Sequence, residues 1–152
     1  MVEILEGQTL EMEHLISFRG KITQTEVESV GREMEMFVAQ AGAHRVGNPV
    51  TATYGIEAGK IDMELLLPID KQIEGSEKYA YKERIRIVNA VVAKYTGNPN
   101  GLQDACNELN QYIMEHKLVP VTVGYNITKR VDTANLENTE IDVYVGISQN
   151  IL

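Results

Sequence analysis

Cysteine, tryptophan and long apolar runs are scarce or missing in this 152-residue chain. Cys106 is the one cysteine, which excludes an intrachain disulfide and a cysteine-based zinc site. No apolar run approaches the roughly 20 residues that a membrane-spanning helix needs. Residues 1–6 lack the basic start and long apolar stretch of a signal peptide, so we expect a cytoplasmic protein without membrane contact.

Basic residues are the minority among the charged side chains. Fourteen Lys and Arg face 22 Asp and Glu, giving a formal net charge of −8. Because this charge repels a phosphate backbone and the basic residues are scattered, we expect no direct binding to nucleic acid. The 43% hydrophobic content is ordinary for a globular protein and predicts a single domain over residues 1–152.

The familiar signatures of catalysis are also missing. The chain has no Gly-x-Ser-x-Gly motif, no phosphate-binding glycine loop and no dinucleotide fingerprint. His14, His44 and His116 fit no metal-ligand spacing, and Cys106 falls on the apolar stripe of a helical pattern. We therefore predict no cofactor and no metal, and the sequence favours a protein that is not an enzyme.

What the chain does contain is internal repetition. Residues 49–56 and 120–127 share Pro, Val, Thr, Tyr and Ile at matching places. Flanking segments match in the same order, with Phe18-Arg19-Gly20 parallel to Tyr95-Thr96-Gly97 and residues 61–65 parallel to 141–145. The repetition predicts two copies of one unit, over about 10–68 and 84–148, joined by a linker over about 69–83.

Each copy shows the periodicity of a strand, a helix and two further strands. Apolar residues recur at helical spacing between each aromatic-x-Gly and the following Pro-Val-Thr, and alternate with period two elsewhere. Thr25 with Glu28 predicts a capping box, Gly42 a helix end, and Asn98-Pro99 a helix start. The pattern predicts an α+β fold of two βαββ repeats with elements at about 10–20, 25–41, 49–57 and 60–68, then 84–96, 99–116, 120–129 and 139–148.

A duplicated βαββ unit with these motifs resembles the GyrI-like family of small-molecule-binding domains, over about residues 10–148. The resemblance implies pseudo-twofold symmetry, antiparallel sheets, one long helix per repeat and a central ligand groove. It also implies relatives among bacterial multidrug-binding effector domains of transcription regulators, a gyrase inhibitor, and hydrolases of strained-ring toxins. One departure concerns a glutamate that the family often places two residues before the strand tyrosine, where this chain has Ala52 and Val123.

Glu64 is the candidate replacement for that carboxylate. It lies on the less apolar face of its predicted strand, and the matching position of the second copy is Tyr144. Desolvation there would raise a carboxylate pKa and suit it to acid or base chemistry, so Glu64 is the catalytic candidate if the protein is an enzyme. The tyrosines are candidates because each has a polar tip on an apolar body. His14 is a candidate because it alternates with Met12, Ile16 and Phe18 along one predicted strand. The predicted ligand-binding residues are Tyr54, Glu64, Tyr125, Tyr144, Phe18, Tyr95 and His14.

Three functions remain open at this stage. The first is a stand-alone sensor or sequestering protein that binds a small hydrophobic or aromatic ligand. With no DNA-binding segment expected before residue 10, regulation would pass through sequestration, a homodimer or a regulatory protein partner. The alternatives are a hydrolase that detoxifies a strained-ring compound and a protein-interaction module without a ligand.

Overall fold

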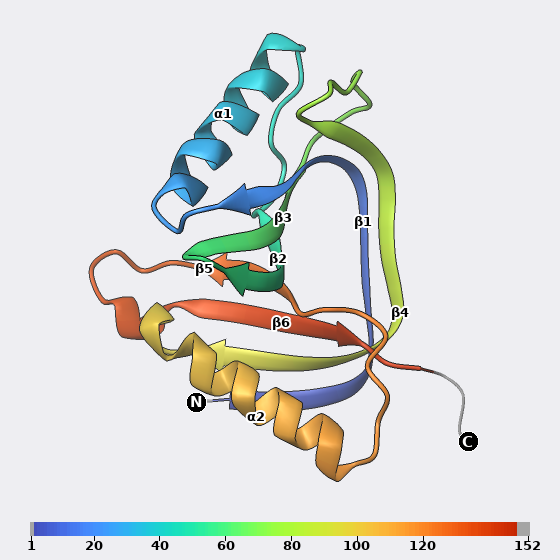
Figure 1. Cartoon of the computed structure of the whole chain (residues 1–152), viewed down its shortest axis with the longest axis vertical. Coiled ribbons are helices and arrows are strands. Elements are labelled where there is room, and N and C mark those ends of the chain that lie inside the picture. The colour runs from blue at the N-terminus through green and yellow to red at the C-terminus, as the bar shows by residue number, and fades with distance from the viewer. Residues whose placement is uncertain (1, 149–152) are drawn as a thin grey trace. The chain divides into compact units, whose positions relative to one another are not determined.

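The computed structural model describes residues 2–148, which form a mixed α+β protein dominated by antiparallel sheet, with two α-helices (Figure 1). The chain divides into two compact units, one of residues 11–85 and one of residues 2–10 with 86–148. Neither helix is long and apolar enough to cross a membrane. The elements are β1 (Val2–Ile22), α1 (Glu26–Gln40), β2 (Val50–Glu57), β3 (Lys60–Pro68), β4 (Ala80–Thr96), η1 (Pro99–Gly101), α2 (Leu102–Glu115), β5 (Tyr125–Arg130), η2 (Leu136–Asn138) and β6 (Glu140–Gly146).

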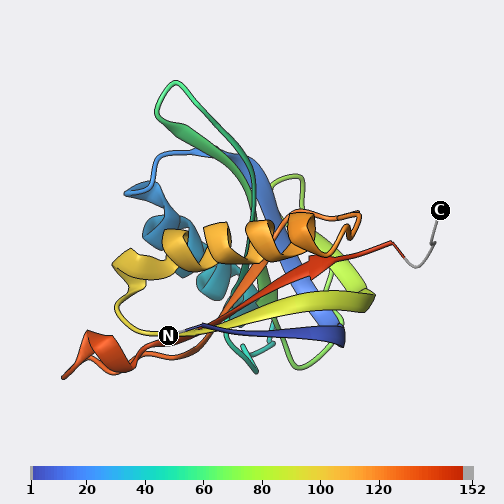
Figure 2. The same ribbon diagram turned by 90° about the horizontal axis from the view of Figure 1, so that it is seen from below.

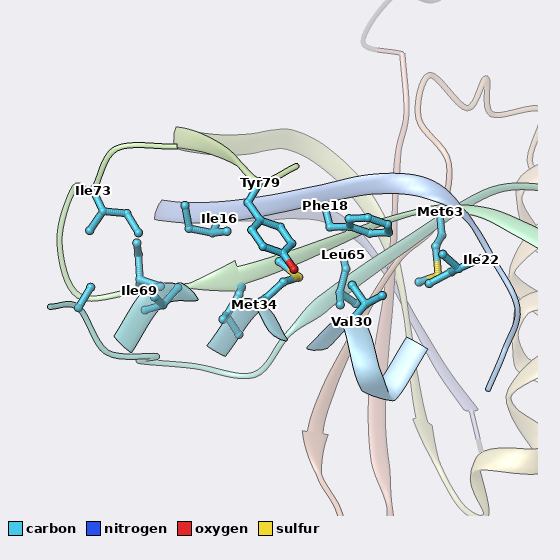
Figure 3. Packing of buried hydrophobic residues seen from close by; sticks show 13 residues of the cluster. Ile16, Phe18, Ile22, Val30, Met34, Met63, Leu65, Ile69, Ile73 and Tyr79 are labelled. Carbon is cyan, nitrogen blue, oxygen red and sulfur yellow. The ribbon is translucent and has the colours of Figure 1, made fainter. Parts of the chain in front are cut away.

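The unit of residues 11–85 is an antiparallel sheet with α1 packed on one face. β3 is central, pairing Leu65 with Phe18 of β1 and with Thr51 of β2. Its alternate residues pack under α1 against Val30, Met34 and Val38. Figure 3 shows Leu65 of β3 beside Val30 of α1. A tight turn joins β2 and β3, with positive φ at Ala58 and Gly59.

Both ends of α1 are fixed by local hydrogen bonds. The predicted capping box of Thr25 with Glu28 is wrong, since Thr25 makes no side-chain cap and the Glu26 carboxylate instead accepts from the Thr23 N–H and hydroxyl. The box lies two residues earlier because the first turn already closes from the Glu26 N–H to the Thr23 carbonyl. At the other end Gly42 has φ of 81°, the left-handed conformation predicted there.

The predicted linker of residues 69–83 is largely part of this unit. Ile69, Ile73 and Tyr79 are buried in the core under α1 (Figure 3). The Tyr79 ring lies against the rings of Phe18 and Phe37. β4 already begins at Ala80. The polar residues of this segment suggested a loop, but its three apolar side chains bury surface that the short helix leaves uncovered.

The unit of residues 2–10 and 86–148 has β6 between β4 and β5, with α2 lying across the sheet (Figure 2). Leu109 and Ile113 of α2 pack on Val143 and Val145 of β6. The predicted cap is present as a 3₁₀ turn, where the Asn98 side chain accepts from the Asn100 N–H and α2 follows from Leu102.

β5 is shorter than the predicted strand over 120–129. Pro120 makes only an isolated bridge to Ile147, and regular pairing starts at Tyr125. Before it, the Thr122 hydroxyl accepts from the Gly146 N–H, so a side chain takes the place of a ladder hydrogen bond. The predicted ranges of the other elements agree with the structure to within a few residues, except at the earlier starts of β1 and β4.

The structure gives the aromatic-x-Gly motif a physical reason. A Cβ on Gly20 would lie 2.9 Å from the Phe18 ring, and one on Gly97 would lie 2.7 Å from the Tyr95 hydroxyl. In both places the aromatic ring folds over the glycine that lies two residues further along the chain. The strand register nevertheless differs between the two copies. Phe18 pairs with Leu65, whereas Tyr95 pairs with Ile141, the residue that the internal repeat matches to Ile61.

Thr139 offers a test of how polar groups are satisfied in this unit. Its buried hydroxyl has no hydrogen-bond partner among residues 2–148. Replacing it by the similarly shaped valine is expected to raise the free energy of unfolding by about 1 kcal/mol, because an unsatisfied polar group leaves the interior. Urea denaturation measures the change. Thr122→Val, which removes a bonded hydroxyl, is the control and should destabilise; a loss of stability in both would contradict the prediction.

Candidate functional site

Glu64 is a buried carboxylate on β3 and the centre of the candidate site. It lies between Met63 and Leu65, which face the core under α1, so its own side chain points to the opposite face of the sheet. Its register partners are Arg19 of β1 and Ala52 of β2. Only 5% of the residue is exposed. The sequence predicted this face and the desolvation of Glu64, but the raised pKa predicted with it is wrong, because the net shift is downward.

Three side chains donate hydrogen bonds to the Glu64 carboxylate. The Ser17 hydroxyl and the Lys82 ammonium each lie 2.6 Å from Oε2, and the Tyr54 hydroxyl lies 3.5 Å from Oε1. Desolvation raises the pKa of Glu64, but the hydrogen bonds from Lys82 and Ser17 outweigh it and the net shift is downward. Glu64 is therefore ionised at neutral pH, with its own counter-ion in place.

Tyr54 reaches this carboxylate because β2 is irregular at that residue. Thr53 pairs with Met63 and Gly55 with Asp62, which leaves Tyr54 as the extra residue of a bulge. Bulges of this kind re-aim a side chain, and here the ring turns toward Glu64. The Arg19 guanidinium lies 3.6 Å from the ring centroid.

Arg19 is itself held by Asp62 across the ladder, at 3.1 Å. We call Ser17, Arg19, Tyr54, Glu64 and Lys82 the Glu64 cluster. It combines a buried carboxylate, two cations and a tyrosine that is 39% exposed. The sequence singled out Tyr54 and Glu64 but not the other three. Ser17, which interrupts the otherwise apolar run of residues 15–18, was the available signal.

Tyr125 and Tyr144 come together in the other unit. They are direct register partners on β5 and β6. Burial raises the pKa of Tyr144, and the charge of Asp142 adds to this. The sequence comparison matches Tyr125 to Tyr54, yet the residue opposite Glu64 is Ala52. Tyr125 therefore meets Tyr144 as its register partner, whereas Tyr54 contacts Glu64 through a bulge in β2.

The remaining predicted ligand residues lie elsewhere within their units. Phe18 is buried under α1, on the face of the sheet opposite to Glu64. Tyr95 packs on Ala105 and Ile141, and its hydroxyl donates to the Asn98 carbonyl. His14 has φ of 56° and shares a 2.6 Å hydrogen bond with the Tyr81 hydroxyl.

Solved structures share this architecture at low sequence identity. The EcmrR C-terminal domain has a TM-score of 0.78 at 12% identity, covering 99% of this chain and 98% of that one. SAV2435 bound to tetraphenylphosphonium has a TM-score of 0.57 at 12% identity, covering 98% and 94%. A hydrolase from Listeria innocua has a TM-score of 0.60 at 12% identity, covering 97% and 91%.

EcmrR also appears in a complex with DNA, where the TM-score is 0.79 at 13% identity. The alignment covers 98% of this chain, which spans 58% of that EcmrR chain. No protein-family model and no curated protein matches the sequence. At these identities the comparisons show the fold alone, and this shared α+β fold is consistent with the resemblance to GyrI-like domains found in the sequence.

Proposed function

We propose that this chain binds a small hydrophobic or aromatic molecule, and that Tyr54 is a contact. The observation that carries the proposal is a half-exposed tyrosine ring fixed between a guanidinium and a buried carboxylate. Such a ring offers a flat apolar surface whose orientation is already fixed, which lowers the entropic cost of stacking. The shared fold with the tetraphenylphosphonium-bound SAV2435 and with the EcmrR C-terminal domain supports binding of a small organic ligand.

The charges of the Glu64 cluster favour an uncharged ligand over a lipophilic cation. Glu64 is paired with Lys82, and Arg19 is paired with Asp62. The two negative and two positive charges of these groups cancel, so the cluster has no net negative charge to attract a cation. Ala52, which stands where the family often has a glutamate, is the register partner of Glu64. Glu64 therefore brings a carboxylate next to that position, but one already neutralised.

Tyr125 and Tyr144, register partners on β5 and β6, stay predicted ligand contacts within their own unit. The element orders β1-α1-β2-β3 and β4-α2-β5-β6 support a duplicated βαββ unit. Its pseudo-twofold symmetry and central groove, which the resemblance implies, stay predictions. The chain would act as a sensor or a sequestering protein related to the effector domains of transcription regulators.

A thermal-shift titration with triphenylphosphine oxide, which is aromatic and uncharged, tests this proposal. A ligand at 100 times its Kd is expected to add about 2.7 kcal/mol to the free energy of unfolding. The shift should disappear in Tyr54→Ala, persist in the control Tyr112→Ala, and be no larger for tetraphenylphosphonium. An equal shift in Tyr54→Ala would show that the Tyr54 ring does not contact the ligand. If no aromatic compound shifts the melting temperature, a protein-interaction module is favoured.

Hydrolysis is the second candidate, because a hydrolase shares the fold. Glu64 would then act as the general acid or base. Its lowered pKa and its pairing with Lys82 make it a weak base and a poor proton donor at neutral pH. Mass spectrometry after incubation with strained-ring electrophiles decides between the two: turnover that disappears in Glu64→Gln would establish the enzyme.

A further inference from the structure

A pocket lies wholly within the unit of residues 2–10 and 86–148, beside the paired ends of β4 and β6. Its volume is about 380 Å³, within the usual size range of small-molecule sites. Charged residues dominate its lining: Glu3, Glu140 and Asp142 with Lys94 and Lys129, together with Tyr95 and Thr96. We call it the Asp142 pocket.

Asp142 is the unusual member of this lining. It is 7% exposed and lies on β6 between the register partners Lys94 of β4 and Ile127 of β5. Within residues 2–148, no side chain makes a hydrogen bond or ion pair with its carboxylate, although its charge acts on the Tyr144 phenol. A buried carboxylate without a hydrogen-bond partner is costly, because desolvation of the charge is not repaid.

The Asp142 oxygens still touch open space. In the described part of the chain, Thr139 Oγ1 is the one fully enclosed side-chain oxygen or nitrogen that has no partner. The Asp142 carboxylate, by contrast, is not fully enclosed, and the space that it borders is the pocket. A group entering the pocket can therefore reach this carboxylate directly.

We propose that the Asp142 pocket binds a small organic molecule through a primary ammonium group. Asp142 is the counter-ion, and Glu140 is a second acceptor at the pocket wall. Three carboxylates face two ammonium groups, so the lining has a net negative charge that suits a cation. The volume is far larger than a bare metal ion needs, and residues 2–148 contain no group of three or more acidic, His or Cys side chains arranged to hold one.

This site is independent of the Glu64 cluster. It lies in the other unit, uses a carboxylate without a resident counter-ion, and selects a cation where the Glu64 cluster favours a neutral ring. The two proposals therefore fail separately. Tyr54→Ala should leave the binding of an amine unchanged, and Asp142→Asn should leave the binding of triphenylphosphine oxide unchanged.

The test is a calorimetric titration of the whole chain with 1,5-diaminopentane, accompanied by ¹⁵N amide shifts. Saturable binding should move the amides of Lys94, Tyr95 and Asp142. Asp142→Asn should weaken it about tenfold or more, since a charge-assisted hydrogen bond is lost. Glu140→Gln should weaken it about twofold by removing a nearby charge, and Glu108→Gln, which removes a charge on the exposed side of α2, should have no effect.

Lys94→Met separates a ligand site from an internal ion pair. If Lys94 only competes with the ligand for Asp142, its removal should tighten diamine binding severalfold. Weaker binding, or non-additive losses of stability in Asp142→Asn and Lys94→Met, would show that Lys94 is the partner of Asp142 and overturn the proposal. The proposal would also be overturned if 1,5-pentanediol bound as tightly as the diamine, or if calcium bound at the same site. Undiminished diamine binding by Asp142→Asn would overturn it as well. If Asp142→Asn does not fold, diamine binding by Glu140→Gln and Lys94→Met still tests the proposal.

Discussion

Replacing Lys82 by methionine is expected to lower the free energy of unfolding by about 2 kcal/mol. The substitution leaves the Glu64 carboxylate buried without its counter-ion, while Ser17 and Tyr54 still donate to it. Breaking a fully buried pair typically costs 3–5 kcal/mol, and we expect less because the Lys82 side chain is 40% exposed. For a chain of this length the change corresponds to a fall in Tm of about 6 °C.

Lys78→Met is the matched control for this prediction. Lys78 also pairs with a glutamate, Glu33, at 3.0 Å, but both side chains are half exposed. Exposed ion pairs contribute little because water screens them, so Tm should hardly change. Equal losses from Lys82→Met and Lys78→Met would mean that the burial of Glu64 does not strengthen its ion pair.

Acid should act on the same pair. The pKa of Glu64 is lowered in the folded chain from its usual 4.5, because the hydrogen bonds from Lys82 and Ser17 outweigh desolvation. The stabilisation is therefore complete above pH 4.5 and is lost as pH falls through the lower pKa of the folded state. Glu64→Gln should flatten this part of the stability–pH curve, as measured by urea denaturation between pH 3 and 7. A curve as steep as that of the parent chain would assign the acid dependence to other carboxylates.

The order of elements is predictable because each has a periodic pattern of its own. The apolar residues of α1 and α2 recur at helical spacing, and those of β3 and β6 alternate, so both kinds appear near their predicted places. Residues 69–79 show what periodicity misses. Ile73 and Tyr79 are isolated among polar residues, and only the space beside α1 reveals that they belong to the core.

The candidate site was predictable only in part, for a similar reason. Alternation along β3 places Glu64 opposite the core face, and that part of the prediction needs no partner. Its neighbours are Ser17 and Lys82, 47 and 18 residues away in the sequence, and no pattern says that their side chains meet. The bulge at Tyr54 also has no signal in the sequence, because one extra residue leaves the apolar–polar alternation on either side of it intact.

Truncating Met34 to alanine is expected to cost about 3 kcal/mol, the largest effect of a single substitution considered for this chain. Met34 is fully buried at the centre of the core under α1, where Val30 and Leu65 surround it (Figure 3). The lost side chain leaves a cavity between helix and sheet that neighbours on a rigid ladder cannot fill. Urea denaturation followed by circular dichroism measures the loss.

Met36→Ala makes the same chemical change two residues along the same helix, where the side chain is 61% exposed. Alanine is also the better helix former, so the free energy of unfolding should change by less than about 0.5 kcal/mol in either direction. The pair therefore separates burial from helix propensity. Comparable losses from the two substitutions would show that α1 does not dock on the sheet through Met34, and the face that carries Glu64 would then lose the support that fixes it.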